Sequence, residues 1–570
     1  MSVLRRDVAV LAVVGVIASA VLAVARASTA APSHARALDT PPPTLPPIHL
    51  PIALDGPLPR VSVPTGLPPT ATSTHTPITP IPAHSTTPTV TSSPTTDGPS
   101  PTSLPAPTTV PTLPAGGARP WPDTADGIHV FNDQLVGLGN LSDAQVRFAA
   151  SHYVGTQKMT RRDADRLRTL APNFLILHYR LGTGLGYRVA EGDCAPTGGF
   201  IQIVDGDRWV QEWPGDAAVR PPWFFPYANA DRIYFCAFGW YLMDVANDDY
   251  RRWWTDEVLR QLEANDDDAL FADSVSVPNY FGGDHWRPNL PAIDAAFEAD
   301  WTRRIDDWLA YVKERFGDRY LLLPNAGNWV TTRDRTTYAA ADGVMIEGFA
   351  SWAPDRRYAE GDWRLQMDRV LGLTTRGKVI IAQAYPTGDG SPRDVDDRMF
   401  TLATYLLVKG RRSYLNLETS SYVDWLPEYE IDLGRYVDEP PEHVDALLER
   451  TDGLSPALYV RRYERGMVVV NPSDQPVSYN LGRTMWSARP VGGGEVPADG
   501  RTDGWRVVYS PAQRIDFAPG GAEVLLYEPP LSYDLSTTPG NMYSVGRGGS
   551  ETRPYAGVHT YAGDLMMDGR

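Results

Sequence analysis

Two short segments each join an apolar run of strand length to a carboxylate. They are ALFADSVSV, which contains Asp273, and DGVMIEGFASW, which contains Glu347. Buried parallel strands are typically continuous apolar runs, so each carboxylate stands where a strand leaves the core. In an eight-stranded α/β barrel that end of the strands is the catalytic face. Two carboxylates on this face are the minimum equipment for breaking a glycosidic bond.

The two acids can take different chemical roles. A small aspartate near hydrogen-bond donors stays ionised, so Asp273 can attack an anomeric carbon. A glutamate in apolar company can have its pKa raised, so Glu347, close to Phe349 and Trp352, can donate a proton. The assignment can also be reversed. The structural alternative for either acid is a helix cap or a salt bridge at the rim of the barrel.

The chain on both sides of these segments, from about 127 to 418, alternates strand and helix patterns. The predicted strands are 127–135, 153–159, 174–181, 269–275, 320–327, 343–349, 378–385 and 413–418. The predicted helices are 142–153, 161–171, 248–265, 293–316, 336–341, 363–373 and one that begins at Ser391 and Pro392. Eight such repeats predict a (β/α)8 TIM barrel. The alternative, a doubly wound open sheet, is disfavoured because the glycines after the third strand lead into a loop rather than a helix.

Polar and aromatic side chains stand at the other strand ends. Those predicted to contact substrate are Asp133, His178, Arg180, Asn325, Trp329, Trp352, Gln383, Tyr385 and Glu418. Other strand-end residues are Gln157, Lys158, Tyr179 and Asn416. Sugar hydroxyls need amides and carboxylates for hydrogen bonds, and sugar C–H faces need aromatic rings. The ring of strand ends therefore predicts a carbohydrate cleft.

A long insert, residues 182–246, follows the third strand. It contains Trp209, Trp213, Trp223, Phe224, Phe225 and Tyr227 together with Cys194 and Cys236, the two cysteines of the chain. Long loops in compact domains are usually functional or disordered, and this aromatic density argues against disorder. We expect a wall of the substrate cleft that is stapled by a Cys194–Cys236 disulfide. The alternatives are a lid packed on the barrel without ligand contact, and two unpaired thiols.

The termini have a different composition from the barrel. Residues 1–31 carry Arg5 and Arg6 before an apolar run, which predicts either a signal peptide or an N-terminal membrane anchor. Residues 32–120 are rich in Pro, Thr and Ser and are predicted to be a disordered linker, and residues 531–570 are predicted to be a disordered tail. The barrel is expected over 121–434 and a small all-β sandwich over 435–530. This organisation predicts an extracellular or cell-surface protein, either secreted or tethered to a membrane by its N-terminal segment.

Composition excludes several classes of function. The formal net charge of -17 argues against nucleic acid partners, which require basic patches. HExxH and GxSxG motifs are missing, so a zinc hydrolase or a serine esterase lacks its parts. Two cysteines are too few for a structural zinc site. We therefore expect no metal and no cofactor, and the oligomeric state is not predicted.

The chain from about 125 to 430 resembles hypothetical TIM-barrel glycosyl hydrolases related to family 114 and, more distantly, to the α-galactosidase superfamily. The resemblance rests on MDVANDDYRRWW before the fourth strand, ALFADSV as that strand and GVMIEGF as the sixth. The segments VVVNPSDQPVSYNL and VLLYEP resemble the β-sandwich appended to many such barrels. Strand four reads FADS here, whereas relatives often flank the aspartate with Gly and Asn.

The resemblance implies Asp273 as the nucleophile or stabilising carboxylate, and Glu347 as the acid/base. It also implies retention at an α-linked polysaccharide without a cofactor. The main prediction is thus an exported glycoside hydrolase that acts on a polysaccharide. The alternatives are a barrel that binds glycans without cleaving them and a scaffold protein of envelope assembly.

Overall fold

The computed structural model describes residues 119–530 except 136–137, 187–201, 206–207, 212–219, 226–231, 236–238, 279–285, 288–289, 291–292, 352, 355, 420–421 and 450–457. The described residues all belong to one compact unit. The N-terminal segment, almost all of the linker, both cysteines and the C-terminal tail lie outside them. Within the described part of the chain, no helix combines the length and the apolar character that a bilayer span requires.

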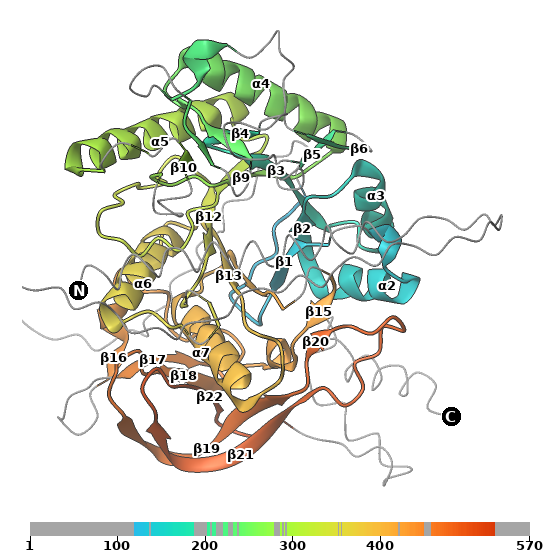
Figure 1. Ribbon diagram of the computed structural model, residues 1–570. Helices are drawn as coiled ribbons and strands as arrows, with labels where there is room; N and C mark the ends of the chain where they lie inside the picture. The colour runs from blue at the N-terminus through green and yellow to red at the C-terminus, as the bar shows by residue number, and fades with distance from the viewer. Residues whose placement is uncertain are drawn as a thin grey trace, which may run out of the picture. The chain divides into compact units, whose positions relative to one another are not determined.

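Eight parallel strands form the centre of the molecule (Figure 1). They are β1 (Val130–Gln134), β2 (Tyr153–Gln157), β3 (Leu175–Leu181), β9 (Ala269–Asp273), β11 (Leu321–Pro324), β12 (Gly343–Glu347), β13 (Val379–Ala384) and β14 (Ser413–Leu417). The hydrogen-bonded order is β11-β9-β3-β2-β1-β14-β13-β12. A parallel bridge between Asn325 and Met345 joins the two end strands, with Ala326 N donating to the Met345 carbonyl at 3.0 Å. The predicted barrel is confirmed.

An apolar plug fills the inside of this barrel. Its inward side chains are Phe131, Leu175, Leu177, Ala269, Phe271, Leu321, Leu323, Met345, Val379, Ile381 and Tyr414. Successive side chains of a strand point to opposite faces, so only every second residue can enter the plug. The intervening residues face the surrounding helices. This alternation decides which strand-end residues lie inside the barrel mouth.

Six α-helices surround the strands in the described residues. They are α2 (Asp143–His152), α3 (Arg161–Leu170), α4 (Asp248–Asn265), α5 (Ala295–Phe316), α6 (Glu360–Thr374) and α7 (Pro392–Val408). Short 3-10 turns are η1 (Leu138–Asn140), η2 (Pro221–Trp223), η5 (Pro427–Glu430) and η6 (Val444–Leu447). Ser142 and Gln145 form the predicted capping box of α2, and Ser391 caps α7 with Pro392 in its first turn. The packing against the barrel is dominated by Trp254, Trp301, Trp308 and Trp363, which are fully buried.

The short helix predicted over 336–341 is wrong, since this segment is a turn. Tyr338 adopts a left-handed backbone with φ of 51°, which a helix interior does not tolerate. Its side chain is buried, and its hydroxyl donates to the Val275 carbonyl at 2.7 Å. Burying this ring against the loop after β9 overrides the local helical preference.

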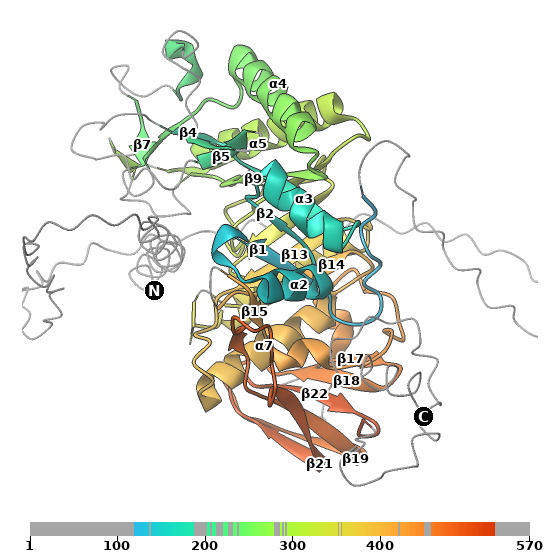
Figure 2. The ribbon, with the colours of Figure 1, turned by 90° about the vertical axis from the view of Figure 1, so that its right-hand side faces the viewer.

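The insert after β3 forms small antiparallel strands beside α4 and α5 (Figure 2). One sheet contains β4 (Gly184–Gly186), β8 (Trp240–Leu242) and β7 (Tyr234–Phe235), and it is extended by β10 (Trp286–Arg287) from the loop after β9. A separate pair contains β5 (Gln202–Asp205) and β6 (Arg208–Gln211). Trp223 stacks on Trp253 of α4 with ring centroids 5.0 Å apart, and Phe225 lies 5.1 Å from Trp301 of α5. These described aromatics therefore pack as core under the insert.

The C-terminal region is all-β, as predicted, but its six main strands form one antiparallel sheet rather than two facing sheets. The order is β16 (Leu448–Glu449), β17 (Leu458–Tyr463), β18 (Gly466–Val470), β22 (Ala522–Leu526), β19 (Val477–Val491) and β21 (Arg506–Phe517). A separate antiparallel pair joins β15 (Asp424–Trp425), which follows the last barrel strand, to β20 (Gly494–Glu495), which lies between β19 and β21 in sequence. The central strands pack on α7 (Figures 1 and 2), so a barrel helix replaces the second sheet of a sandwich.

Arg461 of β17 fastens this sheet to the end of α7. Its guanidinium donates to the carbonyls of Leu406, Leu407 and Lys409 at 3.2, 3.1 and 2.7 Å. It also lies 4.5 Å from the centre of the Tyr436 ring. The C-terminal carbonyls of a helix have no partners within the helix, and a buried cation satisfies them here.

We expect Arg461→Met to lower the free energy of unfolding by about 2–4 kcal/mol, because the buried carbonyls of Leu407 and Lys409 lose their donor. Urea denaturation of the full chain measures this. The matched control is Arg462→Met, whose side chain is exposed and pairs with Glu449 on the surface. That control should cost less than about 1 kcal/mol. Equal losses in the two variants would contradict the proposed fastening role.

Candidate active site

Asp273 and Glu347 lie together at the mouth of the barrel. Asp273 ends β9 and Glu347 ends β12, and both side chains remain partly accessible to solvent. Asn325 Nδ2 donates to Asp273 Oδ1 at 2.9 Å and to Glu347 Oε2 at 2.6 Å. Because both oxygens contact one nitrogen, their separation cannot exceed the sum of these distances, about 5.5 Å.

The alternation of the strands explains this convergence. On five strands, the residue two positions after the last side chain of the plug also faces inward, because side chains alternate along a strand. These residues are Tyr179, Asp273, Asn325, Glu347 and Gln383. Parallel strands end at one face of the barrel, so these five positions form a polar layer directly above the apolar plug. The sequence places them on neighbouring strands β3, β9, β11, β12 and β13.

Each carboxylate also accepts a hydrogen bond from a phenol. Tyr179 Oη donates to Asp273 Oδ2 at 2.6 Å, and Tyr385 Oη donates to Glu347 Oε1 at 2.6 Å. Both tyrosines are partly accessible, as the acids are. The two carboxylates are thus oriented by neutral donors, which fix their geometry without neutralising their charge.

The surroundings of Glu347 favour its protonated form. Burial raises the pKa of Glu347 to about 7, and the nearby charge of Asp273 adds to the increase. The hydrogen bonds from Tyr385 and Asn325 act in the opposite direction, since they stabilise the carboxylate. At neutral pH, Glu347 is therefore poised to hold and release a proton.

Lys158 brings a positive charge to the same mouth. It follows β2 with a left-handed φ of 58°, and its Nζ lies 3.3 Å from Asp133 Oδ2 and 4.8 Å from the centre of the Tyr179 ring. Burial alone would lower the pKa of Lys158, but the carboxylates of Asp133, Asp273, Glu418 and Glu347 raise it overall. A permanent cation therefore partly balances the negative charge of the acids.

A buried amide layer supports the remaining strand ends. Gln383 Nε2 donates to Tyr385 Oη at 2.5 Å and to Glu418 Oε2 at 3.2 Å. Asn416 donates to Gln383 Oε1 at 3.3 Å, while Gln157 donates to Asp133. Asp133, Asn325, Gln383 and Glu418 are all buried. These predicted residues join the cluster as its buried part and support the accessible acids and tyrosines.

The backbone is strained directly after the strands that carry the site. Ser274 follows Asp273 with φ of 57°, and Gly348 follows Glu347 with φ of 83°. A non-glycine residue in this left-handed region costs roughly 1–2 kcal/mol. The sharp turns let both carboxylates end their strands at the mouth rather than continue along the wall.

His178 and Arg180 lie outside the cluster, which corrects the expectation that they contact substrate. They alternate with Leu177 and Tyr179 on β3, so they face α4 instead of the barrel interior. His178 contacts Asp267 at 3.2 Å and Gln261 at 2.9 Å, and Arg180 donates to Gln261 at 2.9 Å. Both side chains are buried between strand and helix.

The tryptophans that were predicted to contact substrate do not join the polar cluster in the described residues. Trp329 is buried against Tyr338 and Arg369 and packs in the outer core, so it does not offer its face to a ligand. Trp352 lies outside the described residues, as do Cys194 and Cys236 with their predicted disulfide. Trp223 and its two neighbours fit the alternative of a lid packed on the barrel.

Lys158 and Tyr179 were not predicted as substrate contacts, although both stand at strand ends. The alternation of Leu175 and Leu177 points directly to Tyr179. Lys158 is harder to find, because its left-handed backbone turns the side chain away from the strand pattern.

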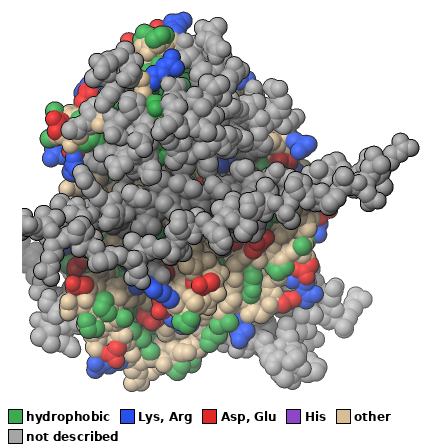
Figure 3. Space-filling model, in the orientation of Figure 1, with side chains coloured by type: hydrophobic (Ala, Val, Ile, Leu, Met, Phe, Trp, Pro, Cys, Tyr) green, Lys and Arg blue, Asp and Glu red, His purple; other side chains and the backbone are tan. Residues whose placement is uncertain are grey.

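The described residues offer no metal centre, since no group of three or more His, Cys, Asp or Glu side chains converges as ligands. On the face shown in Figure 3, acidic and basic side chains of the described residues are interspersed rather than gathered by sign. The site chemistry at the barrel mouth is therefore that of carboxylates, phenols and amides.

Comparison with known families agrees with this geometry. Residues 169–467, more than half of the chain, match the model of hypothetical glycosyl hydrolase family 15. The chain belongs to this family, and it is accordingly a glycoside hydrolase built on a barrel. No curated protein is significantly similar to it in sequence.

Solved structures resemble the chain only distantly. A maltogenic alpha-amylase, AmyB, from Thermotoga neapolitana is 12% identical over 70% of this chain and 98% of its own, with a TM-score of 0.33. The GH36 alpha-galactosidase AgaA from Geobacillus stearothermophilus is 8% identical over 70% of this chain and 55% of its own, with a TM-score of 0.34. Scores of this size carry no argument about substrate.

The raised pKa of Glu347 predicts a pH-dependent stability. The folded-state value of about 7 exceeds the ordinary 4.5, so the stabilisation is fully present below pH 4.5 and is lost as pH rises through 7. Glu347→Gln does not titrate. The native protein loses this stabilisation between pH 5 and pH 8, whereas the variant does not. The free energy of unfolding of Glu347→Gln minus that of the native protein should therefore rise by about 2–3 kcal/mol over this range.

Urea denaturation of both proteins at the two pH values measures this difference. Glu314→Gln, an exposed carboxylate on α5, is the matched control and should show almost no change. A Glu347→Gln difference that stays constant with pH would show that this carboxyl titrates normally.

Proposed function

We propose that the protein is an exported hydrolase of an α-linked polysaccharide that acts with retention, using Asp273 as nucleophile and Glu347 as acid/base. The observation that carries the proposal is the pair of carboxylate oxygens held within about 5.5 Å by one amide. Retaining glycosidases hold their carboxyl groups about 5–5.5 Å apart, whereas inverting enzymes need about 6.5–9.5 Å to admit water.

The first step breaks the glycosidic bond. An oxygen of Asp273 bonds to the anomeric carbon while that carbon loses its bond to the bridging oxygen. The electron pair stays on the bridging oxygen, which takes the proton of Glu347 and leaves as an alcohol. The raised pKa of Glu347 keeps that proton available near neutrality.

The second step releases the sugar. Glu347, now ionised, accepts a proton from water, and the water oxygen bonds to the anomeric carbon. The bond to Asp273 breaks, and its electron pair returns to the carboxylate. Tyr179 and Asn325 donate to Asp273 and stabilise the negative charge that reappears there.

Asn325 couples the two acids throughout the cycle. Its amide contacts both carboxylates, so each stays oriented while its charge changes. Asn325 is buried and belongs to the bridge that closes the barrel. A rigid donor of this kind costs no reorganisation during the reaction.

The α-linkage and the export of the protein are proposed from the sequence rather than from the geometry of the site. The α-linkage rests on the resemblance of ALFADSV and GVMIEGF to the α-galactosidase superfamily. Export rests on the basic and apolar N-terminal sequence before a long Pro/Thr-rich segment. A non-catalytic glycan-binding barrel is disfavoured because neutral donors, rather than arginine or lysine, hold both acids in the described part of the chain.

The test is reducing-end release from soluble starch, pullulan, dextran and polygalactosamine, with cellulose and laminarin as β-linked comparisons. We expect cleavage of an α-linked polymer, and a fall in kcat of about 10²–10⁴-fold in Glu347→Gln. Asp273→Asn should abolish formation of the glycosyl-enzyme. The anomeric proton of the first product, followed by NMR, should show retention.

The matched controls are Glu314→Gln and Asp318→Asn, which remove exposed carboxylates far from the barrel mouth in sequence. Both should keep full activity. Inversion at the anomeric carbon would overturn the nucleophile role of Asp273. Failure of the native chain to cleave any α-linked polymer would overturn the proposed activity.

Tyr385→Phe provides a pH-dependent prediction. Its hydroxyl stabilises the ionised form of Glu347, so removing it should raise the pKa of Glu347. The basic limb of kcat/KM, expected near pH 7, should move upward by on the order of one unit. The control is Tyr320→Phe, since Tyr320 precedes β11 at the opposite end of the barrel from Glu347. This variant should leave the basic limb of kcat/KM in place. A downward shift in Tyr385→Phe would contradict Glu347 as the acid.

A further inference from the structure

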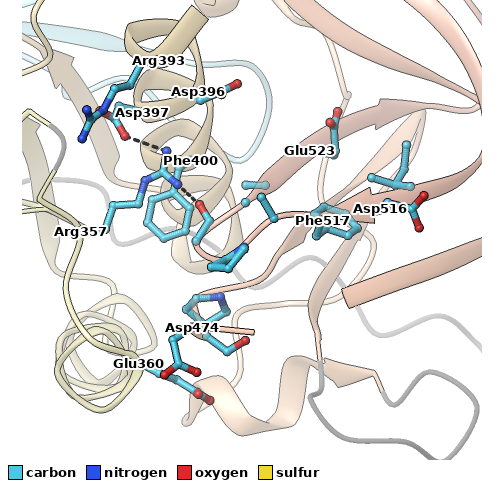
Figure 4. Close-up of a pocket in the computed structure, with 18 of the residues that line it drawn as sticks. Arg357, Glu360, Arg393, Asp396, Asp397, Phe400, Asp474, Asp516, Phe517 and Glu523 are labelled. Carbon is cyan, nitrogen blue, oxygen red and sulfur yellow. Dashed lines mark hydrogen bonds and ion pairs between the residues drawn. The ribbon is translucent and has the colours of Figure 1, made fainter. Parts of the chain in front are cut away.

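A cavity lies between the barrel and the C-terminal sheet (Figure 4). It measures about 1100 Å³, and we call it the rim cleft. Its barrel wall includes Arg357, Glu360, Asp396 and Asp397, and its sheet wall includes Asp474, Asp516 and Glu523. The two walls come from segments far apart in the sequence, so the cleft exists only because the sheet packs on α7.

The cleft lies towards the catalytic end of the barrel. Helices of a (β/α)8 barrel run antiparallel to the strands, so their N-termini stand at the end where the strands finish. Glu360 begins α6, and Asp396 and Asp397 lie in the first two turns of α7. These helices follow β12 and β13, which carry Glu347 and lead to Tyr385. The segments that follow Glu347 and Tyr385 therefore lead from the mouth to the barrel wall of the cleft.

The charges of the cleft select the kind of ligand. Six carboxylates and three arginines line it. Arg357 pairs with Asp397 at 2.7 Å and donates to the Gly520 carbonyl, while Arg489 pairs with Asp396. The excess of acceptors repels anions and suits ligands rich in hydroxyl or ammonium donors.

The walls are also preorganised. Arg357 stacks over Phe400 at 4.6 Å and is fixed by its ion pair, and Ser487 donates to Glu523 at 2.6 Å. Ile515 is half-buried and Pro519 is exposed, so the sheet wall also offers apolar surface. Fixed acceptors beside small apolar patches match the hydroxyls and C–H faces of a sugar chain, at little cost in side-chain entropy.

We propose that the rim cleft is an accessory site for a distal stretch of the same polysaccharide, neutral or amine-bearing rather than acidic. The proposal rests on the proposed function for its class of substrate. Binding at a second place on one polymer raises the effective concentration of the scissile bond at the mouth. The enzyme should therefore act better on long chains than on short ones.

The kinetic test uses the polymer that the native chain cleaves and the shortest oligosaccharide of that polymer that it still hydrolyses. Asp474→Ala/Asp516→Ala removes two exposed carboxylates of the sheet wall. We expect its ratio of polymer to oligosaccharide kcat/KM to fall about 5–10-fold. The control Glu314→Gln/Asp318→Asn should keep the native ratio. An unchanged ratio in the cleft variant would overturn the accessory site.

A binding test separates this proposal from the catalytic one. The migration of the full-length Glu347→Gln variant is measured in native gels, each of which contains soluble starch, dextran or polygalactosamine. A further gel contains dextran sulfate, the anionic counterpart of dextran. We expect retardation by at least one uncharged or amine-bearing polymer, weakened by adding the two cleft substitutions. Such retardation supports the cleft even where the native chain hydrolyses nothing. If only dextran sulfate retards the protein, or if none of the polymers does, the accessory site is overturned.

Discussion

Closure of the barrel is the constraint on which the site depends. In the hydrogen-bonded order of the strands, β11 and β12 stand at opposite ends and β9 lies next to β11, so an open sheet would separate Glu347 from Asp273 by almost its whole width. The bridge between Asn325 and Met345 joins these ends. The residue that closes the barrel also donates its amide to both carboxylates. The closure of the barrel and the geometry of the candidate site are therefore fixed at the same position.

Bringing two carboxylates so close creates the asymmetry that the chemistry needs. Two negative charges within about 5.5 Å repel strongly in a partly buried site, so one group keeps its proton near neutral pH. Glu347 is that group, because burial and the charge of Asp273 raise its pKa. Lys158 limits the repulsion without pairing directly with either acid, since its closest carboxylate is Asp133. The native state tolerates this cost because the apolar plug and the helices stabilise the barrel independently.

Much of this arrangement is readable in the sequence. Apolar runs and caps are local signals, so the eight strands, most helices and the two acids were predictable. His178 and Arg180 were misplaced because proximity to a strand end does not reveal which face a residue occupies. Their neighbours Leu177 and Tyr179 carry that information. The turn at Tyr338 and the single C-terminal sheet depend on partners distant in sequence, which local patterns do not encode.

The C-terminal sheet also supports the loop that follows β13. Asp394 of α7 accepts from Gly388 N at 2.8 Å and Thr387 Oγ1 at 3.0 Å, which shapes the loop after Tyr385. Arg398 lies 3.3 Å from Asp394 and 3.4 Å from Glu428, and all three side chains are buried. The loop before β20 packs on Arg398, so the sheet closes this charged group from water. Two carboxylates compensate the buried charge of Arg398, and the loop that covers them completes the burial of this group. The region beside the mouth is thus positioned by the barrel and the sheet jointly.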